Sequence, residues 1–389
     1  MSTHISRRSC LIAALISLFV ASAAWPLVDV IDRPSISSRR ATKALLLTVT
    51  RADQRLVAAG ERGTVLLSDD NGISWRQAQV PVSVTLTSVR FVDEQNGWAT
   101  GHSGVLLNTT DGGETWRKRL DGNEVAKIVL DAELAKGAAA DPAQLAEAEL
   151  FVADGPDKPL LDVCFLSEEL GYVVGAYGLF LRTDDGGRTW SPWQARLPDL
   201  QGRHLTRIAQ LNGALYLVGE QGVAYLSTDG GATFKDLKSP YGGTFFGVDA
   251  LSSNEVLIYG LRGHAFRVGP HELRGHAFRD GRRGLRGKDF SDGLRGKGFR
   301  GRLRREEWTR LDSPTPVSFT ASVRLASGKT IIASQTGDLL QSAEDDSSLT
   351  PVREPIHTLI TAMAEAADGS LIVAGRGISR LFLKDGNDK

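Results

Sequence analysis

The sequence contains few of the residues that form disulfides and metal sites. Among 389 residues there are two cysteines and seven histidines, and 46 basic residues balance 46 acidic ones. Cys10 lies in the first apolar stretch, so Cys164 stands alone in the rest of the chain and cannot form an internal disulfide. No histidines have the His-x-x-x-His spacing of a zinc site. We therefore expect no metal and no cofactor, and we interpret Cys164 as a small buried residue.

Two familiar catalytic motifs are also missing. The "SGKT" at residues 327–330 has Val323 where a phosphate-binding loop needs its first glycine, and "GHSG" at residues 101–104 is not a nucleophile elbow. A glycosidase with two carboxylates stays open as an alternative, because acids contributed by distant segments leave no sequence pattern.

One short pattern recurs four times: Ser/Thr-x-Asp-x-Gly-x-Ser/Thr-aromatic. "SDDNGISW" begins at residue 68, and "TTDGGETW", "TDDGGRTW" and "STDGGATF" begin at residues 109, 183 and 227. Successive aspartates are 41, 74 and 44 residues apart, and apolar runs separated by turn residues surround each copy. A repeat of roughly 40–50 residues with four strand candidates predicts the blade of a β-propeller.

The residues within each copy suit a tight turn better than a catalytic or calcium site. Glycine allows a positive φ, the aspartate side chain can accept hydrogen bonds from turn amides, and the aromatic residue can pack under a neighbouring turn. The register and the distal glutamate of an EF-hand are missing. We interpret these residues as structural: Asp70, Gly72, Trp75, Asp111, Gly113, Trp116, Asp185, Gly187, Trp190, Asp229, Gly231 and Phe234.

A second pattern, Gly-x-x-Gly, gives the number of blades. It begins at residues 60, 101, 175, 219 and 260, and "SQTG" (334–337) and "GRG" (375–377) are degenerate copies. Seven units predict an all-β, seven-bladed propeller of four-stranded blades. The last unit has only three strand candidates, so we expect the strand-like "WPLVDVIDRP" at residues 25–34 to supply the fourth strand and close the ring.

Two insertions interrupt the repeat. Residues 121–158 are rich in Ala, Glu, Leu and Lys and predict a helical insertion between blades two and three. Residues 262–305 form a basic, Gly/Arg-rich insertion that repeats "LRGHAFR" and related sequences. This segment could contact RNA or anionic lipid weakly, although we expect no specific nucleic-acid binding, and a tolerated surface loop is the alternative.

The N-terminus predicts export. Residues 1–23 combine Arg7 and Arg8 with an apolar run and Ala21-Ser22-Ala23, which is the pattern of a signal peptide. Cleavage there would leave residues 24–389 as the propeller. "SRRSCL" is also close to a twin-arginine signal, so both export routes stay open. A membrane anchor formed by an uncleaved N-terminal helix is the alternative.

The four boxes resemble the Asp-box (BNR) repeat of sialidases, sortilin-like receptors and some endoglucanases. With the Gly-x-x-Gly turns, the blades are still more similar to the photosystem II assembly/stability factor family of seven-bladed propellers. That resemblance implies a protein of the periplasm, or of the thylakoid lumen in a photosynthetic source, that is not an enzyme and binds a membrane-complex subunit. The alternative is an Asp-box glycoside hydrolase, sialidase-like or endoglucanase-like, although the sequence shows no evident sialidase residue set.

Side chains between the paired glycines should project from one face of the propeller. Arginine, histidine and tyrosine there suit a polar interface with an anionic partner segment. The helical insertion should flank this face as a wall or a lid, and we expect a monomer. The alternative is a ring of solvated loops. The candidate binding residues are Arg62, His102, Tyr177, Arg262 and Arg376.

Overall fold

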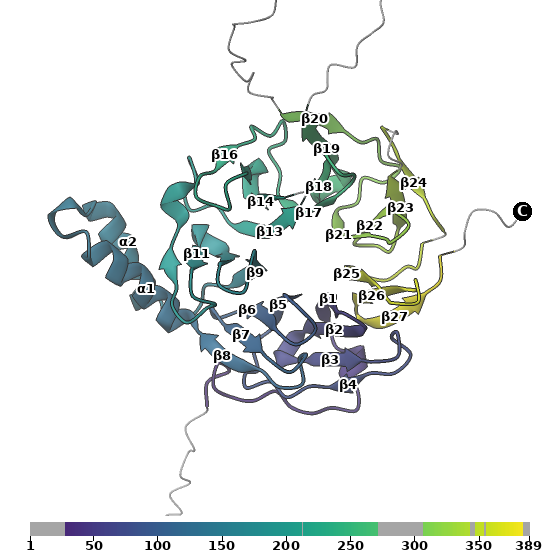
Figure 1. Cartoon of the computed structure of the whole chain (residues 1–389), viewed down its shortest axis with the longest axis horizontal. Coiled ribbons are helices and arrows are strands. Elements are labelled where there is room, and N and C mark those ends of the chain that lie inside the picture. Colours follow the sequence, from purple (N-terminus) through teal and green to yellow (C-terminus); the bar gives the residue numbers. More distant parts are fainter. Residues whose placement is uncertain (1–27, 212, 271–305, 343–346, 354, 384–389) are drawn as a thin grey trace, which may run out of the picture.

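A computed structural model describes residues 28–211, 213–270, 306–342, 347–353 and 355–383 (Figure 1). Seven small antiparallel sheets stand in a ring, and strands that follow one another in sequence are neighbours in each sheet. The sequence prediction of a seven-bladed, all-β propeller is confirmed. Within the described residues six blades have four strands and the last has three.

The blades follow one another around the ring in sequence order. The first three blades contain β1 (Leu46–Ala52), β2 (Arg55–Gly60), β3 (Val65–Ser68) and β4 (Arg76–Gln77); β5 (Leu86–Phe91), β6 (Gly97–Gly101), β7 (Leu106–Thr109) and β8 (Arg117–Leu120); and β9 (Leu160–Phe165), β10 (Gly171–Gly175), β11 (Phe180–Thr183) and β12 (Ser191–Pro192). The remaining blades contain β13 (Leu205–Leu211), β14 (Ala214–Gly219), β15 (Ala224–Ser227) and β16 (Lys235–Asp236); β17 (Phe245–Ala250), β18 (Val256–Gly260), β19 (Ala265–Pro270) and β20 (Glu306–Arg310); β21 (Phe319–Arg324), β22 (Thr330–Ser334), β23 (Leu339–Ser342) and β24 (Leu349–Pro351); and β25 (Ile360–Glu365), β26 (Leu371–Gly375) and β27 (Gly377–Leu381).

Two α-helices form the predicted insertion between blades two and three. They are α1 (Gly122–Leu134) and α2 (Pro142–Ala153). Asp121 begins α1 with a capping box, in which its side chain accepts from the Glu124 amide and the Glu124 side chain accepts from the Asp121 amide. Asp141 caps α2 by accepting from the Ala143 amide at 2.9 Å. In the described part of the chain, neither these nor any other helix is long and apolar enough to cross a membrane.

Short 3₁₀ turns connect many of the strands. They are η1 (Ala41–Lys43), η2 (Glu61–Gly63), η3 (Gly137–Ala139), η4 (Ala176–Gly178), η5 (Gln194–Arg196), η6 (Glu220–Gly222) and η7 (Leu261–Gly263). Four of them, η2, η4, η6 and η7, are the Gly-x-x-Gly turns between the second and third strands of their blades. The Asp boxes follow the third strands, so they lie at the opposite ends of the blades.

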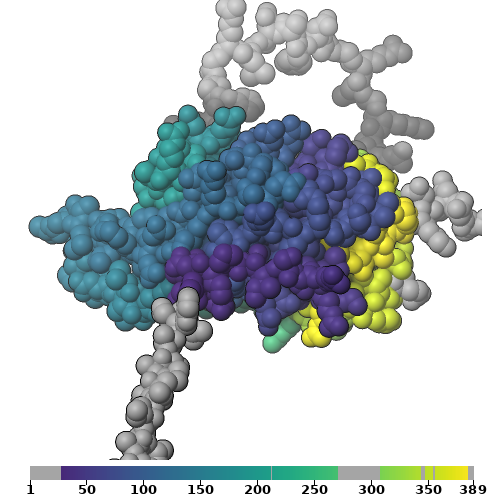
Figure 2. Space-filling model, turned by 90° about the horizontal axis from the view of Figure 1, so that it is seen from below, coloured from purple at the N-terminus to yellow at the C-terminus, as the bar shows by residue number. Residues whose placement is uncertain are grey.

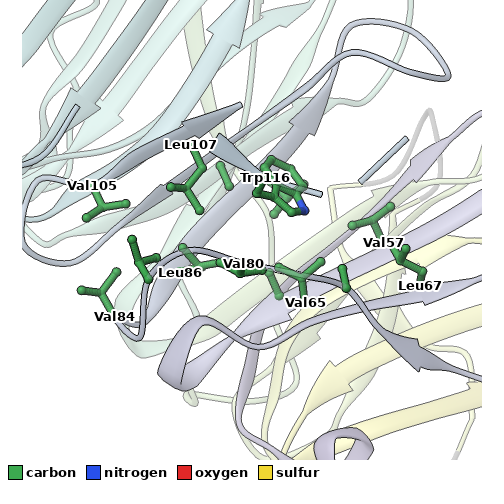
Figure 3. Close-up of a cluster of buried hydrophobic side chains, with 14 of the residues drawn as sticks. Val57, Val65, Leu67, Val80, Val84, Leu86, Val105, Leu107 and Trp116 are labelled. Atoms are coloured by element: carbon green, nitrogen blue, oxygen red, sulfur yellow. The ribbon is translucent and has the colours of Figure 1, made fainter. Parts of the chain in front are cut away.

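The hydrophobic core is divided into clusters that lie between neighbouring blades. Figure 3 shows the cluster between blades one and two, where Val57 and Leu67 of one blade face Leu107 and Trp116 of the next. Comparable clusters join each further pair, including blades seven and one, where Leu46 and Ile372 are buried together. Burial of aliphatic side chains between sheets is therefore the main force that holds each blade to the next.

A repeated bulge adds hydrogen bonds between blades. The first strand of every blade shifts register after its first residue, and a threonine stands at this bulge in four blades. The hydroxyl group donates to a carbonyl in the first strand of the next blade, for example from Thr206 to Phe245 at 2.7 Å and from Thr320 to Ile360 at 2.6 Å. Because a bulge interrupts the regular ladder, the threonine side chain links the blades where the backbone pairing is irregular.

The prediction that residues 25–34 close the ring is wrong for the part that the structure describes. Residues 28–34 form a turn and irregular backbone and lie along the outside of blades one and two, as the purple segment of Figure 2 shows. Ile31 is buried in the cluster between these blades, Ser83 donates its amide to the Val30 carbonyl at 2.8 Å, and Lys118 pairs with Asp32 at 2.6 Å. Ile31 alone of the apolar residues in 28–34 is buried against the outer rim, whereas Val28 and Val30 are exposed. Residues 25–27 lie outside the described residues.

Blades seven and one close the ring by direct contact. Thr361 donates its hydroxyl to the Leu46 carbonyl at 2.6 Å, the same contact that internal blades make. Gly377 donates its amide to the Ala44 carbonyl at 3.0 Å, and Leu45 forms an isolated bridge with Arg376. The chain just before β1, and not residues 28–34, therefore runs beside the start of β27.

The predicted basic insertion at residues 262–305 overlaps a blade. Residues Leu261–Gly263 form η7 and Ala265–Pro270 form β19, which pairs with both β18 and β20. The first copy of "LRGHAFR" is thus the turn and third strand of blade five. Residues 271–305, with the later copies, lie outside the described residues.

Candidate binding face and central channel

The Asp boxes are hydrogen-bonded turns. Asp185 accepts from the Thr183 hydroxyl at 2.8 Å, from the Thr189 amide at 2.9 Å and from the Thr189 hydroxyl at 2.6 Å. The hydrogen bonds from Thr189 lower the pKa of Asp185 to about 2, since they stabilise its ionised form. Asp70, Asp111 and Asp229 accept equivalent hydrogen bonds within their own turns.

Each box also contacts the preceding blade. Gly187 has a φ of +77°, and a Cβ there would collide with the Trp98 ring of blade two. Trp190 packs edge-on against Trp98, with ring centres 6.2 Å apart. Phe234 makes the corresponding contact with Phe180, at 5.5 Å. The box residues thus fix a turn and join it to the neighbouring blade.

The Gly-x-x-Gly turns hold non-glycine residues in the left-handed region. The second residue between the glycines has φ near +55° at Arg62, Ser103, Tyr177, Gln221 and Arg262. This conformation is unfavourable for residues with a Cβ, and glycine or asparagine would be the less strained choice. The same strained conformation recurs at equivalent turns. A surface role for these side chains would explain why it is kept.

All five predicted face residues are exposed, but they are not all equivalent. Arg62, Tyr177 and Arg262 occupy the left-handed position, whereas His102 occupies the position before it and Arg376 lies between β26 and β27. At the first turn position two glutamates have a structural contact instead. Glu61 accepts from the Leu45 amide at 2.9 Å, and Glu220 accepts from the His204 amide at 3.0 Å.

The helical insertion is attached beside this face. Gly122, the first residue of α1, donates its amide to the Ser103 carbonyl at 2.8 Å. Beyond α2, the ammonium of Lys158 lies 5.2 Å from the Tyr177 ring centre, and that ring lies 5.0 Å from the ring of His204. Tyr177 is nevertheless 58% exposed. The helices project outward from the rim in Figure 1, so the insertion has the position of a wall and does not cover the ring as a lid.

A second polar region, which the sequence reasoning missed, lines the centre of the ring. A cavity of about 340 Å³ is bounded by the first strands of the blades, and arginines from four blades line it: Arg51, Arg90, Arg207 and Arg324. Each arginine lies within a strand that also carries core residues. An arginine interrupting the candidate inner strands "LLTVTRA", "LTSVRF", "LTRIAQL" and "FTASVR" was the available signal.

Asp162 is buried in the channel wall between two of these arginines. Its carboxylate lies 3.4 Å from Nε of Arg90 and 3.5 Å from Nε of Arg207, and it accepts from the Ser88 hydroxyl at 2.6 Å. Burial alone would raise the pKa of Asp162, but the charges of Arg207 and Arg90 outweigh it and hold the pKa below its usual value. This ion triad ties together blades two, three and four.

Asp249 has a different environment. It is half-buried in the channel wall and accepts from the Ser322 hydroxyl at 3.0 Å and from the Ala250 amide at 2.8 Å. Burial raises its pKa, because neither hydrogen bond compensates fully for the lost hydration of the carboxylate. Ser322 also lies 3.1 Å from the hydroxyl of Tyr259.

The other groups considered for chemistry are held in structural contacts. Burial raises the pKa of Cys164 to about 11, so its thiol is un-ionised at neutral pH. The hydroxyls of Tyr172, Tyr225 and Tyr241 each donate to a backbone carbonyl at 2.7–2.9 Å. Among the described residues, no group of three or more His, Cys, Asp and Glu is placed to hold a metal ion.

The ring of blades and its hydrogen-bonded boxes define the class of this protein: it is an Asp-box β-propeller. A family model described as "Photosynthesis system II assembly factor YCF48" matches residues 67–133 and 147–266. The chain is 21% identical to the photosystem II assembly lipoprotein Ycf48 of Synechococcus sp. (strain CC9902) over 189 residues, which cover 46% of this chain and 48% of that protein. Over nearly half of its length the chain is thus similar to photosystem II assembly factors, and the aligned region spans about half the length of that relative.

Solved structures show the same fold. The structure titled "YCF48 bound to D1 peptide" has a TM-score of 0.57 and 14% identity, covering 90% of this chain and 96% of that one. A streptogramin B lyase has a TM-score of 0.59 and 11% identity, covering 92% of this chain and 96% of that one. Because a lyase shares the fold, the fold alone does not decide between a binding protein and an enzyme.

Proposed function

We propose that this protein is an exported, non-catalytic scaffold that binds a segment of a membrane-complex subunit, as an assembly factor does. The observation that carries the proposal is the row of exposed residues held in left-handed backbone at the Gly-x-x-Gly turns. The left-handed backbone recurs at the same turn position in several blades, and the residues at that position include Arg62, Tyr177 and Arg262. A surface that presents such residues suits contact with a partner.

The names of the similar proteins indicate which kind of partner to expect. The matched family model and the Synechococcus relative carry the names of photosystem II assembly factors, and one structural neighbour is titled as bound to a D1 peptide. We infer a peptide segment with acidic character as the ligand of this chain, since arginines on the face would pair with carboxylates. In a photosynthetic source, photosystem II would be the complex; in another source, a different envelope complex.

Export to the periplasm or the thylakoid lumen is part of the proposal. It rests on the signal-like pattern of residues 1–23 and on the family resemblance. The binding of RNA or anionic lipid by residues 271–305, and a monomeric state, stay predictions from the sequence.

The test compares two faces of the same ring. In the first variant, alanine replaces Arg62, His102, Tyr177, Arg262 and Arg376. In the control variant, Glu94→Lys, Glu168→Lys and Arg188→Glu change exposed residues on the Asp-box side. Partner recovery from solubilised membranes should fall at least tenfold with the first set and stay near wild type with the second, while both melt normally. Loss with the control set alone would place the interface on the other face.

A further inference from the structure

The central channel contains more positive than negative charge. Four guanidinium groups line the cavity, and the carboxyl groups at or beside it belong to Asp162, Asp249 and Glu365. Even with all three ionised, one positive charge is left over. The Asp162 carboxylate is already shared by Arg90 and Arg207, and the distance from each Nε to its oxygens is close to the upper limit for a hydrogen bond. The two arginines therefore keep donors that this single carboxylate does not satisfy.

The other two arginines have no carboxylate partner among the described residues. Arg51 donates to the Asp53 carbonyl at 2.9 Å and lies 3.5 Å from the Glu365 carbonyl, and Arg324 donates to the Leu251 carbonyl. Both arginines stand near the ends of their strands, on the Asp-box side of the ring. Backbone carbonyls orient these guanidinium groups without neutralising their charge.

We propose that the central cavity binds a small free oxyanion, a carboxylate or a phosphate, between Arg51, Arg324 and the arginine pair of Asp162. Guanidinium groups match the planar carboxylate and the phosphate in both charge and hydrogen-bond geometry. The cavity volume of about 340 Å³ lies at the lower end of the range for small-molecule sites.

The side chain of Asp249 should make this binding depend on pH. Its carboxyl lines the same cavity, and burial raises its pKa, so it is neutral over a wider acidic range than an exposed aspartate. When it ionises it adds a negative charge, which repels an anion. The charged and titratable groups that face the cavity from the surrounding strands are Arg51, Arg90, Arg207, Arg324, Tyr259 and Glu365, with Asp162 and Cys164 behind them.

Calorimetric titration of the full chain with inorganic phosphate and with succinate, at constant ionic strength, tests the site. We expect saturable binding of at least one probe, about tenfold or more weaker in Arg51→Gln/Arg324→Gln, since each lost charge-assisted hydrogen bond is worth about that factor. The matched control Arg188→Gln/Lys235→Gln removes one exposed charge from a box turn and one from the adjoining strand β16, and it should bind as wild type. At any pH where Asp249 is ionised in the wild type, Asp249→Asn should bind each probe more tightly than the wild type at that same pH.

Two results would overturn the proposal. One is the absence of saturable binding of either probe to the folded wild-type protein. The other is equal weakening by the lining and control pairs, which would indicate a diffuse surface charge effect. If the lining pair fails to fold, Arg324→Lys and Asp249→Asn replace it. Equal binding by Asp249→Asn and the wild type at every pH would contradict the role of Asp249, and unchanged binding by Arg324→Lys as well would contradict the site. The pull-down from membranes is a separate readout, so this site can fail while the proposed scaffold function stands.

Discussion

Thr361→Val should weaken the junction where the last blade meets the first. The hydroxyl of Thr361 donates to the Leu46 carbonyl at 2.6 Å. Among the described residues no strand is shared between the two blades, and their backbone pairing is limited to the Gly377–Ala44 hydrogen bond and the Leu45–Arg376 bridge. Valine has nearly the same shape, so the substitution leaves little cavity and removes mainly the hydrogen bond. Leu46 is fully buried and its carbonyl would lose that donor. The loss of the bond and the unsatisfied carbonyl together should cost about 1–3 kcal/mol of unfolding free energy.

Thr206→Val is the matched control, because Thr206 makes the same contact with Phe245 between two blades that are joined by the chain. Urea unfolding should show a similar loss of free energy for both variants. Hydrogen exchange should differ: only Thr361→Val should speed exchange in β1 and β25–β27, since opening there needs no other blade to unfold. A Thr361→Val protein with unchanged stability, beside a destabilised Thr206→Val protein, would refute the idea that this hydroxyl closes the ring.

Three further predictions concern the turns. Gly113→Val places a β-branched residue at φ +89° against Leu67. It should lower the unfolding free energy measured in urea by about 2 kcal/mol or more and leave partner binding unchanged. A variant as stable as the wild type would contradict the packing described. The pKa of Asp185 is about 2, below the ordinary 3.8, so the ionised carboxylate stabilises the fold above about pH 4 and this stabilisation is lost as the pH falls toward 2. Asp185→Asn should therefore flatten the dependence of unfolding free energy on pH over that window. An unchanged dependence would argue against this role of Asp185. Arg62→Gly and Arg262→Gly should each raise stability by about 0.5–1 kcal/mol while weakening partner binding; a loss of stability would show that the left-handed arginines are not strained.

Short-range patterns in the sequence were enough to predict the blades. The glycines and aspartates of each turn act within about eight residues, so their spacing predicts both the Asp-box turns and the Gly-x-x-Gly turns that the structure contains. The same holds for the starts of the two helices, which Asp121 and Asp141 cap. These features needed no knowledge of how the ring closes.

Features that depend on closure were missed or mispredicted. Residues 28–34 have an apolar, strand-like pattern, yet Ile31 is buried against the outer rim, and a sequence pattern does not distinguish that burial from a sheet. The channel arginines come from strands far apart in the chain, and only the completed ring brings Arg51 and Arg324 to the same cavity. Single arginines in otherwise apolar strands are weak signals one at a time.

The most direct test of the central claim is recovery of a partner from the membrane fraction. The full-length, tagged protein, expressed in its own source, should recover a defined subunit of a membrane complex, and the alanine variant of the predicted face should not. Purified protein assayed in parallel should not hydrolyse sialosides or β-glucans. A folded wild-type protein that recovers no membrane subunit and cleaves one of these glycosides would contradict the account and favour an Asp-box glycoside hydrolase.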